Sequence, residues 1–399
     1  MKYWRGYLTA AIFGAIAWVL MAFGNRFTTL VDMVYPYVIR TLQDYLAQWT
    51  SIVDYPVWQL LAVVLAVLIL ASLVLVVLGL ASLVLMIVLK WNPIQWFGWV
   101  LAVCTFIYML HTAVFGLNYY AGPLADDIRM EIATYNADEL EEAAIYYRDH
   151  ANALAEQVKR DKDGNVEFSD FQTLAKQAGD GFQVLTYQYS YSVFAGSTLP
   201  VKELGWADMY TSMGITGVTM GITGEAAVNP QIPDVTLPFT MCHEMAHRMC
   251  IADERDANFT GFLAASVNPS IEFQYSAYFM AYRYCYYALA SANSANAAAA
   301  AARVASGANS LLKRDMNYYT SFFAENKDDT ATRVANTAND TYLKTSGDTE
   351  GIASYDQVVD LLVNWHIESV VLPSLTEEEK PFDPLDESQV DLSGIVNAR

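Results

Sequence analysis

The chain has 399 residues, of which 54% are hydrophobic, and its formal net charge is −20. This apolar share exceeds what a wholly soluble protein of such length carries, so part of the chain is expected to lie in lipid. Residues 1–120 carry a charge of +2 and the remaining 279 residues carry −22. Because nucleic acid is bound through basic surfaces, the acidic distal part excludes a nucleic-acid-binding protein.

Three apolar stretches predict membrane-spanning helices at residues 4–24, 57–89 and 94–117. The first and third have about the 20 residues that a bilayer requires, and the longer second stretch is interpreted as one tilted or protruding helix. Lys2 and Arg5 precede the first helix, and Lys90 lies between the second and third. Because positive residues stay in the cytoplasm, residues 1–119 are predicted to form a multi-pass membrane region with a cytoplasmic N-terminus, followed by an extracytoplasmic domain.

The segment between the first two spans has a helical apolar period that Arg40 and Asp44 interrupt. It predicts a helix at residues 34–52 that either lies along the outer membrane interface or packs on the outer domain. Residues 373–399 are acidic and interrupted by prolines, which predicts a disordered tail. Between these segments, one or two short strands are expected at 215–229, and helices at 138–158, 237–306 and 354–366.

Residues 243–259 read HEMAHRMCIADERDANF and carry the strongest functional signal. His243 and His247 are one turn apart on a predicted helix, so both imidazoles can bind one metal ion. Zinc lowers the pKa of a bound water to about 7, and Glu244 is placed to take a proton from that water. This combination is typical of peptide or amide hydrolysis.

A catalytic zinc needs a third protein ligand, and carboxylates follow the histidines. Asp253 predicts the N-cap of a second helix, which puts Glu254 in its first turn, facing back to the histidines. Asp256 lies about 200° around that helix from Glu254, so the two cannot serve together, and Glu254 is the preferred ligand. Asn258 is on the same face as Glu254 and is expected to orient a ligand by a hydrogen bond.

This stretch resembles the site of bacterial membrane proteins grouped as domain-of-unknown-function family 3810 (DUF3810), with the pattern H-E-x-A-H followed by E-x-E-A-N-F. The likeness extends to FGLNYYAGPL, GITGEAAVNPQIPDVTLPFT, FQYSAYF and YDQVVDLL elsewhere in the chain. The resemblance implies N-terminal spans followed by an extracytoplasmic zinc-peptidase-like domain in a bacterial cell membrane.

The wider gluzincin pattern, HExxH with a glutamate from a following E-x-x-x-D/N helix, implies the same assignments of ligands, base and orienting residue. The chain departs from the DUF3810 pattern at Asp256, where Glu is usual, and at Cys250, where Gly is usual. Pattern and resemblance together predict a mainly α protein. Its three-helix transmembrane region is followed, at residues 120–372, by an extracytoplasmic zincin-like α+β domain with a small sheet.

The preferred hypothesis is a membrane-anchored zinc metalloendopeptidase that cleaves a peptide or protein substrate at the outer membrane face. The strand region 217–229 either aligns a substrate backbone by β-augmentation or is an ordinary strand under the helices. Tyr275 and Tyr278 are candidates to stabilise the oxyanion, with core packing as the alternative. The alternative function is a non-catalytic, zinc-stabilised membrane sensor or scaffold. Cys250 and Cys285 are one possible disulfide pair.

Overall fold

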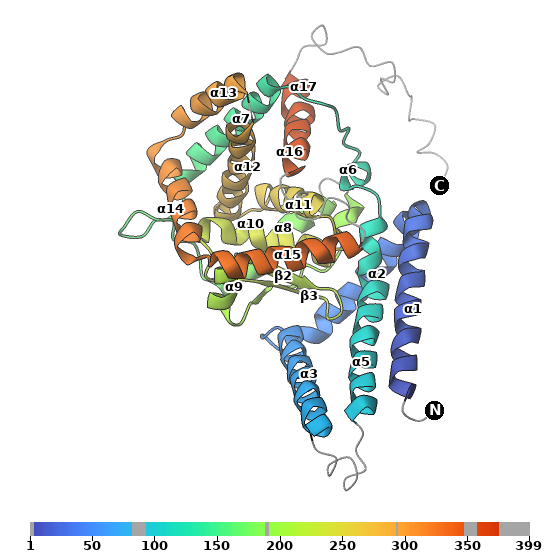
Figure 1. The fold of residues 1–399 in the computed structure, drawn as a ribbon. Coiled ribbons are helices and arrows are strands. Elements are labelled where there is room, and N and C mark those ends of the chain that lie inside the picture. The colour runs from blue at the N-terminus through green and yellow to red at the C-terminus, as the bar shows by residue number, and fades with distance from the viewer. Residues whose placement is uncertain (1–3, 82–92, 188–190, 293, 347–356, 375–399) are drawn as a thin grey trace, which may run out of the picture.

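The computed structural model describes residues 4–81, 93–187, 191–292, 294–346 and 357–374, which are mainly helical (Figure 1). The long N-terminal helices are α1 (Arg5–Arg26), α2 (Thr28–Thr50), α3 (Val57–Ala81) and α5 (Pro93–Val114). The distal part contains the helices η2 (Gly116–Tyr120), α6 (Leu124–Asp127), α7 (Ala137–Ala155), α8 (Phe171–Tyr187), η3 (Ser192–Phe194), α9 (Ala207–Met213), η4 (Asp234–Thr236), α10 (Leu237–Arg248), α11 (Glu254–Ser266), α12 (Ile271–Ser291), α13 (Ala295–Ser306), α14 (Ser310–Asn326), α15 (Asp329–Ser346), α16 (Val358–His366), the π-helix η6 (Ile367–Val371) and α17 (Leu372–Ser374).

Among the described residues, three helical segments are long and apolar enough to cross a membrane, as the hydropathy predicts. They are Arg5–Arg26, Val57–Val74 and Ile94–Val114. In Figure 1, α1, α3 and α5 extend from the same side of the distal part. The third helix is shorter than predicted, because the backbone leaves the helical conformation at Phe115, and Leu117 belongs to the 3-10 helix η2. The predicted continuation of the second helix to residue 89, and most of the predicted acidic tail, lie outside the described residues.

The centre of the distal part is α10, all of whose residues are buried. It packs against α8, α11, α12 and the sheet, and its first turn contains Pro238, which has no N–H to leave unsatisfied there. The helical predictions are confirmed by α7, by α10 to α13 with breaks between them, and by α16. A helix buried on every face is held by tertiary packing, so its side chains are positioned by their neighbours.

A three-stranded sheet lies beside α10, in the order β1-β3-β2. The strands are β1 (Lys202–Glu203), β2 (Gly217–Met220) and β3 (Glu225–Val228). The expected strands are confirmed as the antiparallel pair β2–β3, with Val218 opposite Ala227, whereas β1 pairs parallel to β3 and is too short to leave a sequence pattern. This order places β2 at an edge of the sheet.

Helix α2 packs on the distal part, which is one of the two placements that its sequence allows. Gln43 donates to the backbone oxygen of Gly221 at 2.8 Å, and the Nε of Arg40 donates to that of Met249 at 3.1 Å. The opposite face leaves Val38 and Trp49 exposed, as in a helix that also borders lipid headgroups. The candidate spans are therefore connected to the distal part by buried polar contacts as well as by the chain.

Glu225 forms a second connection, at the N-terminus of α3. Its carboxylate accepts hydrogen bonds from the backbone N–H groups of Val57 and Trp58, at 2.8 and 3.0 Å, and pairs with Lys202 at 2.7 Å. The glutamate is buried, and a negative charge is favoured at a helix N-terminus. One side chain thus joins the sheet, the β1 lysine and a candidate span.

Replacing Glu225 with Ala should lower the free energy of unfolding by about 3 kcal/mol, because the buried Lys202 ammonium loses its partner. Glu203→Ala is a matched control on the same sheet, and its more exposed glutamate should contribute no more than about 0.5 kcal/mol. Denaturant titration of the detergent-solubilised protein, followed by tryptophan fluorescence, measures both. Equal stability of the two variants would contradict the assigned connection.

Candidate metal centre

The two histidines of the HExxH motif lie on adjacent turns of α10, as their spacing predicts. The Nε2 atoms of His243 and His247 are 3.2 Å apart, and both residues are only 8% exposed. The Nδ1 of His247 is hydrogen-bonded to the backbone oxygen of Ile251 at 2.8 Å. Since that bond uses Nδ1 as the donor, Nε2 is left as the metal-binding atom.

Helix α10 ends in a Schellman motif that reverses the chain. The backbone N–H of Cys250 donates to the backbone oxygen of His247 at 2.9 Å, and that of Ile251 donates to the backbone oxygen of Ala246 at 3.1 Å. Cys250 has the left-handed φ of 73°, a conformation that glycine adopts without strain. This conformation explains why a glycine, as in the DUF3810 pattern, is favoured at this position.

Helix α11 brings the third donor back to the histidines. Asp253 caps the helix by accepting from the N–H of Asp256 at 3.1 Å, as predicted. Glu254 follows in the first turn, and its Oε2 lies 3.4 Å from the Nε2 of each histidine. Asp256 instead accepts from the N–H of Leu124 at 2.8 Å, so its carboxylate faces the loop after α5.

The three donor atoms fit a zinc ion. They lie within 4.8 Å of one another, and their separations of 3.2, 3.4 and 3.4 Å match the edge of about 3.3 Å in a tetrahedral site with bonds of about 2.0–2.1 Å. The Oε2 of Glu254 is buried, and apart from the two histidine nitrogens at 3.4 Å it has no hydrogen-bond partner among the described residues. Two imidazoles and one carboxylate are a donor set that zinc prefers and that calcium and magnesium do not.

The closeness of His247 and Glu254 shifts the pKa values of these two groups in opposite directions. Burial alone would lower the pKa of His247, but the charge of Glu254 outweighs it and raises that pKa to about 9. Burial alone would raise the pKa of Glu254, but His247 and His243 outweigh it and hold that pKa well below its usual range. Without metal, the site therefore holds a proton between the histidine and the glutamate.

Glu244 is buried next to strand β2. The hydroxyl of Thr219 donates to its Oε2 at 2.7 Å and also contacts its backbone oxygen at 2.8 Å. A Cβ atom at Gly217 would lie 2.3 Å from its Oε1, so only glycine allows the strand to approach this closely. Burial raises the pKa of Glu244. Thr219 and Gly217 were not found from the sequence, because neither lies near the motif along the chain.

Asn258 lies one turn after Glu254 and is buried, with its Oδ1 accepting from the hydroxyl of Tyr284 at 3.3 Å. Its Nδ2 has no hydrogen-bond partner among the described residues, and the same holds for the Nδ1 of His243. The asparagine is therefore positioned behind the ligands, but the described contacts include no hydrogen bond from it to a ligand. Its orienting role stays a prediction.

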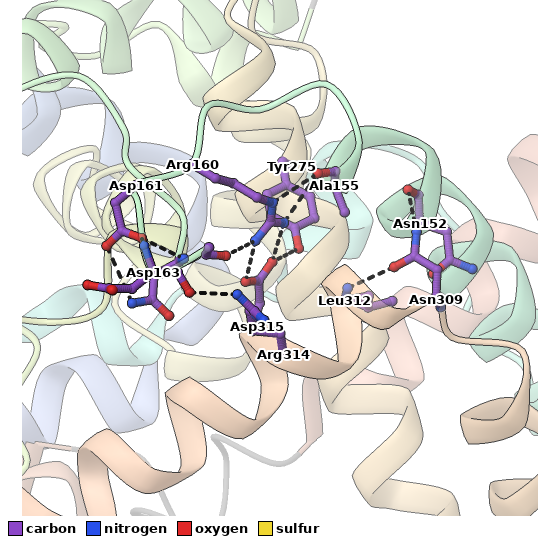
Figure 2. A network of polar contacts seen from close by, with 12 residues as sticks. Asn152, Ala155, Arg160, Asp161, Asp163, Tyr275, Asn309, Leu312, Arg314 and Asp315 are labelled. Carbon is purple, nitrogen blue, oxygen red and sulfur yellow. Dashed lines mark hydrogen bonds and ion pairs between the residues drawn. The ribbon is translucent and has the colours of Figure 1, made fainter.

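The tyrosines expected to stabilise an oxyanion lie in other networks. Figure 2 shows the hydroxyl of Tyr275 directed at Asp315, to which it donates, beside Arg160, whose nitrogens bind the same carboxylate at 2.8 Å. Because its proton is committed to Asp315 and the side chain is fully buried, we assign Tyr275 to the domain core. Tyr278 stacks on His150, with ring centroids 4.7 Å apart.

A different tyrosine, Tyr342 of α15, is electrostatically coupled to the metal centre. Burial raises its pKa, and the charge of Glu254 adds to that rise. Its hydroxyl lies 2.9 Å from the Nε2 of His111 in α5 and 3.4 Å from the hydroxyl of Tyr119. No local pattern in the sequence distinguishes Tyr342 from the other tyrosines, because this contact joins segments more than 200 residues apart.

The four cysteines are unpaired in the structure. The suggested disulfide between Cys250 and Cys285 is therefore not formed. Both thiols are buried, and burial raises the pKa of Cys250 to about 12. Neither is a reactive thiolate at neutral pH.

Comparison with known proteins gives one match. A family model described as "Protein of unknown function (DUF3810)" matches residues 31–363, a range that contains the whole metal centre. No curated protein and no solved structure matches the chain.

Zinc affinity should rise about tenfold per pH unit between about pH 6.5 and 8.5, because zinc must displace the proton of His247. Zinc affinity rises with pH because His247, with a pKa of about 9, is protonated over this range and must lose its proton to bind the metal. Competition with a chelator of known affinity measures the slope, and His150→Gln, which changes a histidine outside the site, should leave it unchanged. A pH-independent affinity would contradict the shared proton.

Proposed function

The chain belongs to the DUF3810 family of proteins of unknown function, and from this premise we propose that it is a membrane-anchored zinc metalloendopeptidase that hydrolyses peptide bonds on the extracytoplasmic face of the membrane. The observation that carries the proposal is the convergence of His243, His247 and Glu254 within 4.8 Å in the protein core. The charge of Glu244 raises the pKa of His247, and this closeness supports Glu244 as the base.

The chain's own residues have separate roles in this proposal. His243, His247 and Glu254 hold zinc, which when bound supplies a Lewis acid that polarises a carbonyl and acidifies a water. Glu244 accepts the proton of the attacking water, and the raised pKa of its carboxyl suits a group that must later return that proton. The hydroxyl of Thr219 fixes one carboxylate oxygen of Glu244 and so orients the other.

Strand β2 is the candidate platform for an extended substrate. It is one of the two edge strands of the sheet, and its residue Thr219 contacts Glu244. A peptide that pairs with a free strand edge is bound through its backbone, which suits an enzyme that cleaves backbone amides. The substrate would lie beside the base.

One observation favours the alternative, a zinc-stabilised sensor or scaffold without hydrolytic activity. The ligands are 7–8% exposed and Glu244 is 4% exposed, as expected of a closed structural zinc site, whereas a catalytic site would have to open before substrate could enter. In the scaffold, zinc would stabilise the junction of α10 and α11. The two functions differ in whether Glu244 affects hydrolysis.

Glu244→Gln tests the catalytic proposal directly. All three ligands remain, so zinc should stay bound, whereas peptide hydrolysis per bound zinc should fall by about 10² to 10⁴, as for loss of a positioned base. Glu254→Gln is the contrasting variant, because it should lose zinc and activity together. Metal content and cleavage of a peptide library are measured on the same preparations. Unchanged activity per zinc in Glu244→Gln would refute the base, and zinc binding without cleavage in the wild type would favour the scaffold.

The proposed orientation rests on Lys2, Arg5 and Lys90, which flank the candidate spans. A protease added to intact right-side-out vesicles should digest the distal part and leave a fragment that contains the spans. A cytoplasmic marker protein, cleaved only after the vesicles are permeabilised, is the control. Protection of the distal part until permeabilisation would reverse the orientation.

A further inference from the structure

A cavity lies next to the turn that joins α10 to α11, between this turn, α2 and the loop after α5. Its volume is about 340 Å³, and its lining includes Asp32, Arg40, Asn118, Asp127 and Ile251. Pockets for small molecules begin at about 300 Å³, so this one can hold a compact ligand. The three proposed zinc ligands and Glu244 are not among the lining residues.

One side of the cavity carries the carboxylates of Asp32 and Asp127, which are exposed to solvent and form no ion pair within 4 Å among the described residues. Asp32 accepts one hydrogen bond, from the N–H of Gly122 at 2.8 Å. Asp127 forms no hydrogen bond or ion pair with a side chain in the part of the chain that the structure describes. Partial burial raises the pKa of Asp127 and the nearby charge of Asp32 adds to the rise, whereas the charge of Arg40 opposes it. A cationic group between the two carboxylates would relieve this repulsion.

The other side carries a buried positive charge. Arg40 is 7% exposed, and its Nε and Nη1 donate to the backbone oxygens of Met249 and Ser192, at 3.1 and 3.3 Å. Within the described ranges it forms no ion pair with a carboxylate. Burial lowers its pKa, and the charge of Asp127 offsets this only in part, because a charge removed from water is destabilised unless an opposite charge compensates it. An acid group in the cavity would supply that compensation.

Asn118 gives an independent sign that the cavity is built for a polar ligand. The residue is 4% exposed, and apart from a weak contact with the thiol of Cys250, neither its amide oxygen nor its amide nitrogen has a hydrogen-bond partner among the described residues. Buried side-chain amides are almost always hydrogen-bonded, so each exception calls for a partner. A ligand in the cavity can both accept from this amide and donate to it.

We propose that this cavity binds a small zwitterion, whose ammonium group faces Asp32 and Asp127, whose acid group faces Arg40, and which is hydrogen-bonded by Asn118. The ligand chemistry is an amino group and an acid group joined by a short chain. A free amino acid and the headgroup of an aminophospholipid both have it. The position of the cavity favours the lipid headgroup as the ligand. Asp32 lies six residues after the end of α1, and Asn118 lies four residues after the end of α5, and both helices are candidate spans.

Calorimetric titration of the full chain in detergent tests the proposal, with O-phosphoethanolamine as the zwitterionic probe. Ethanolamine and inorganic phosphate, its two halves, should each bind at least about tenfold more weakly, because each meets only one side of the cavity. Asp127→Asn should weaken binding of the zwitterion about tenfold and leave phosphate binding unchanged. Asp126→Asn is the matched control, since Asp126 is exposed like Asp127 but does not line the cavity.

The source of the ligand is decided by two further measurements. If the headgroup is the ligand, phosphatidylethanolamine added to phosphatidylglycerol nanodiscs should raise the thermal midpoint of the wild type and of Asp126→Asn, but not of Asp127→Asn. If L-alanine binds as tightly as the probe and the lipid has no effect, the ligand is a free amino acid.

The proposal is overturned if the zwitterion binds no better than its halves, or if Asp126→Asn weakens binding as much as Asp127→Asn. Either result would leave the cavity filled by water. Because binding is measured without reference to zinc or hydrolysis, and can be repeated after chelation, its failure and the failure of the proposed peptidase activity are separate outcomes.

Discussion

The reversal of the chain between α10 and α11 is the constraint on which the metal centre depends. The histidines belong to the first helix and Glu254 to the second, so the three donors meet only if the chain turns back within a few residues. The Schellman motif does this with Cys250 in a left-handed conformation, at a cost of about 1–2 kcal/mol for a residue other than glycine. The same turn presents the oxygen of Ile251 to the Nδ1 of His247. One piece of backbone therefore ends a helix, reverses the chain and orients a ligand.

Contacts from the N-terminal helices stabilise this turn and connect it to the candidate spans. Arg40 of α2 donates to the oxygen of Met249 at the end of α10, and Asp256 at the start of α11 accepts from the N–H of Leu124, the first residue of α6. Glu225 connects the sheet to α3 in a similar way. The family match from residue 31 to residue 363 accordingly includes α2, α3 and α5 as well as the metal centre. The site and the candidate membrane region are therefore joined by direct hydrogen bonds as well as by the chain.

Burial gives the metal centre its chemistry and also restricts access to it. With water largely excluded, the charges of His247 and Glu254 act on each other strongly, and this is why their pKa values move in opposite directions. The same environment raises the pKa of Glu244, which suits a proton acceptor near neutral pH. A polypeptide cannot reach ligands that are 7–8% exposed without a displacement of the structure around them. Hydrolysis would thus require an open form, whereas a structural zinc would not.

Features that depend on neighbouring residues along the chain were predictable from the sequence. The i, i+4 spacing put His243 and His247 on one helix face, the N-cap at Asp253 put Glu254 in the next first turn, and long apolar runs identified the candidate spans. Contacts between distant segments were not predictable. Thr219 and Gly217 reach Glu244 only because β2 packs beside α10, and Tyr275 turns to Asp315 only because α14 lies against its helix. Helical periodicity fixes the direction of a side chain around its own axis, but the segment that it meets is chosen by the packing of the whole core, which no local pattern encodes.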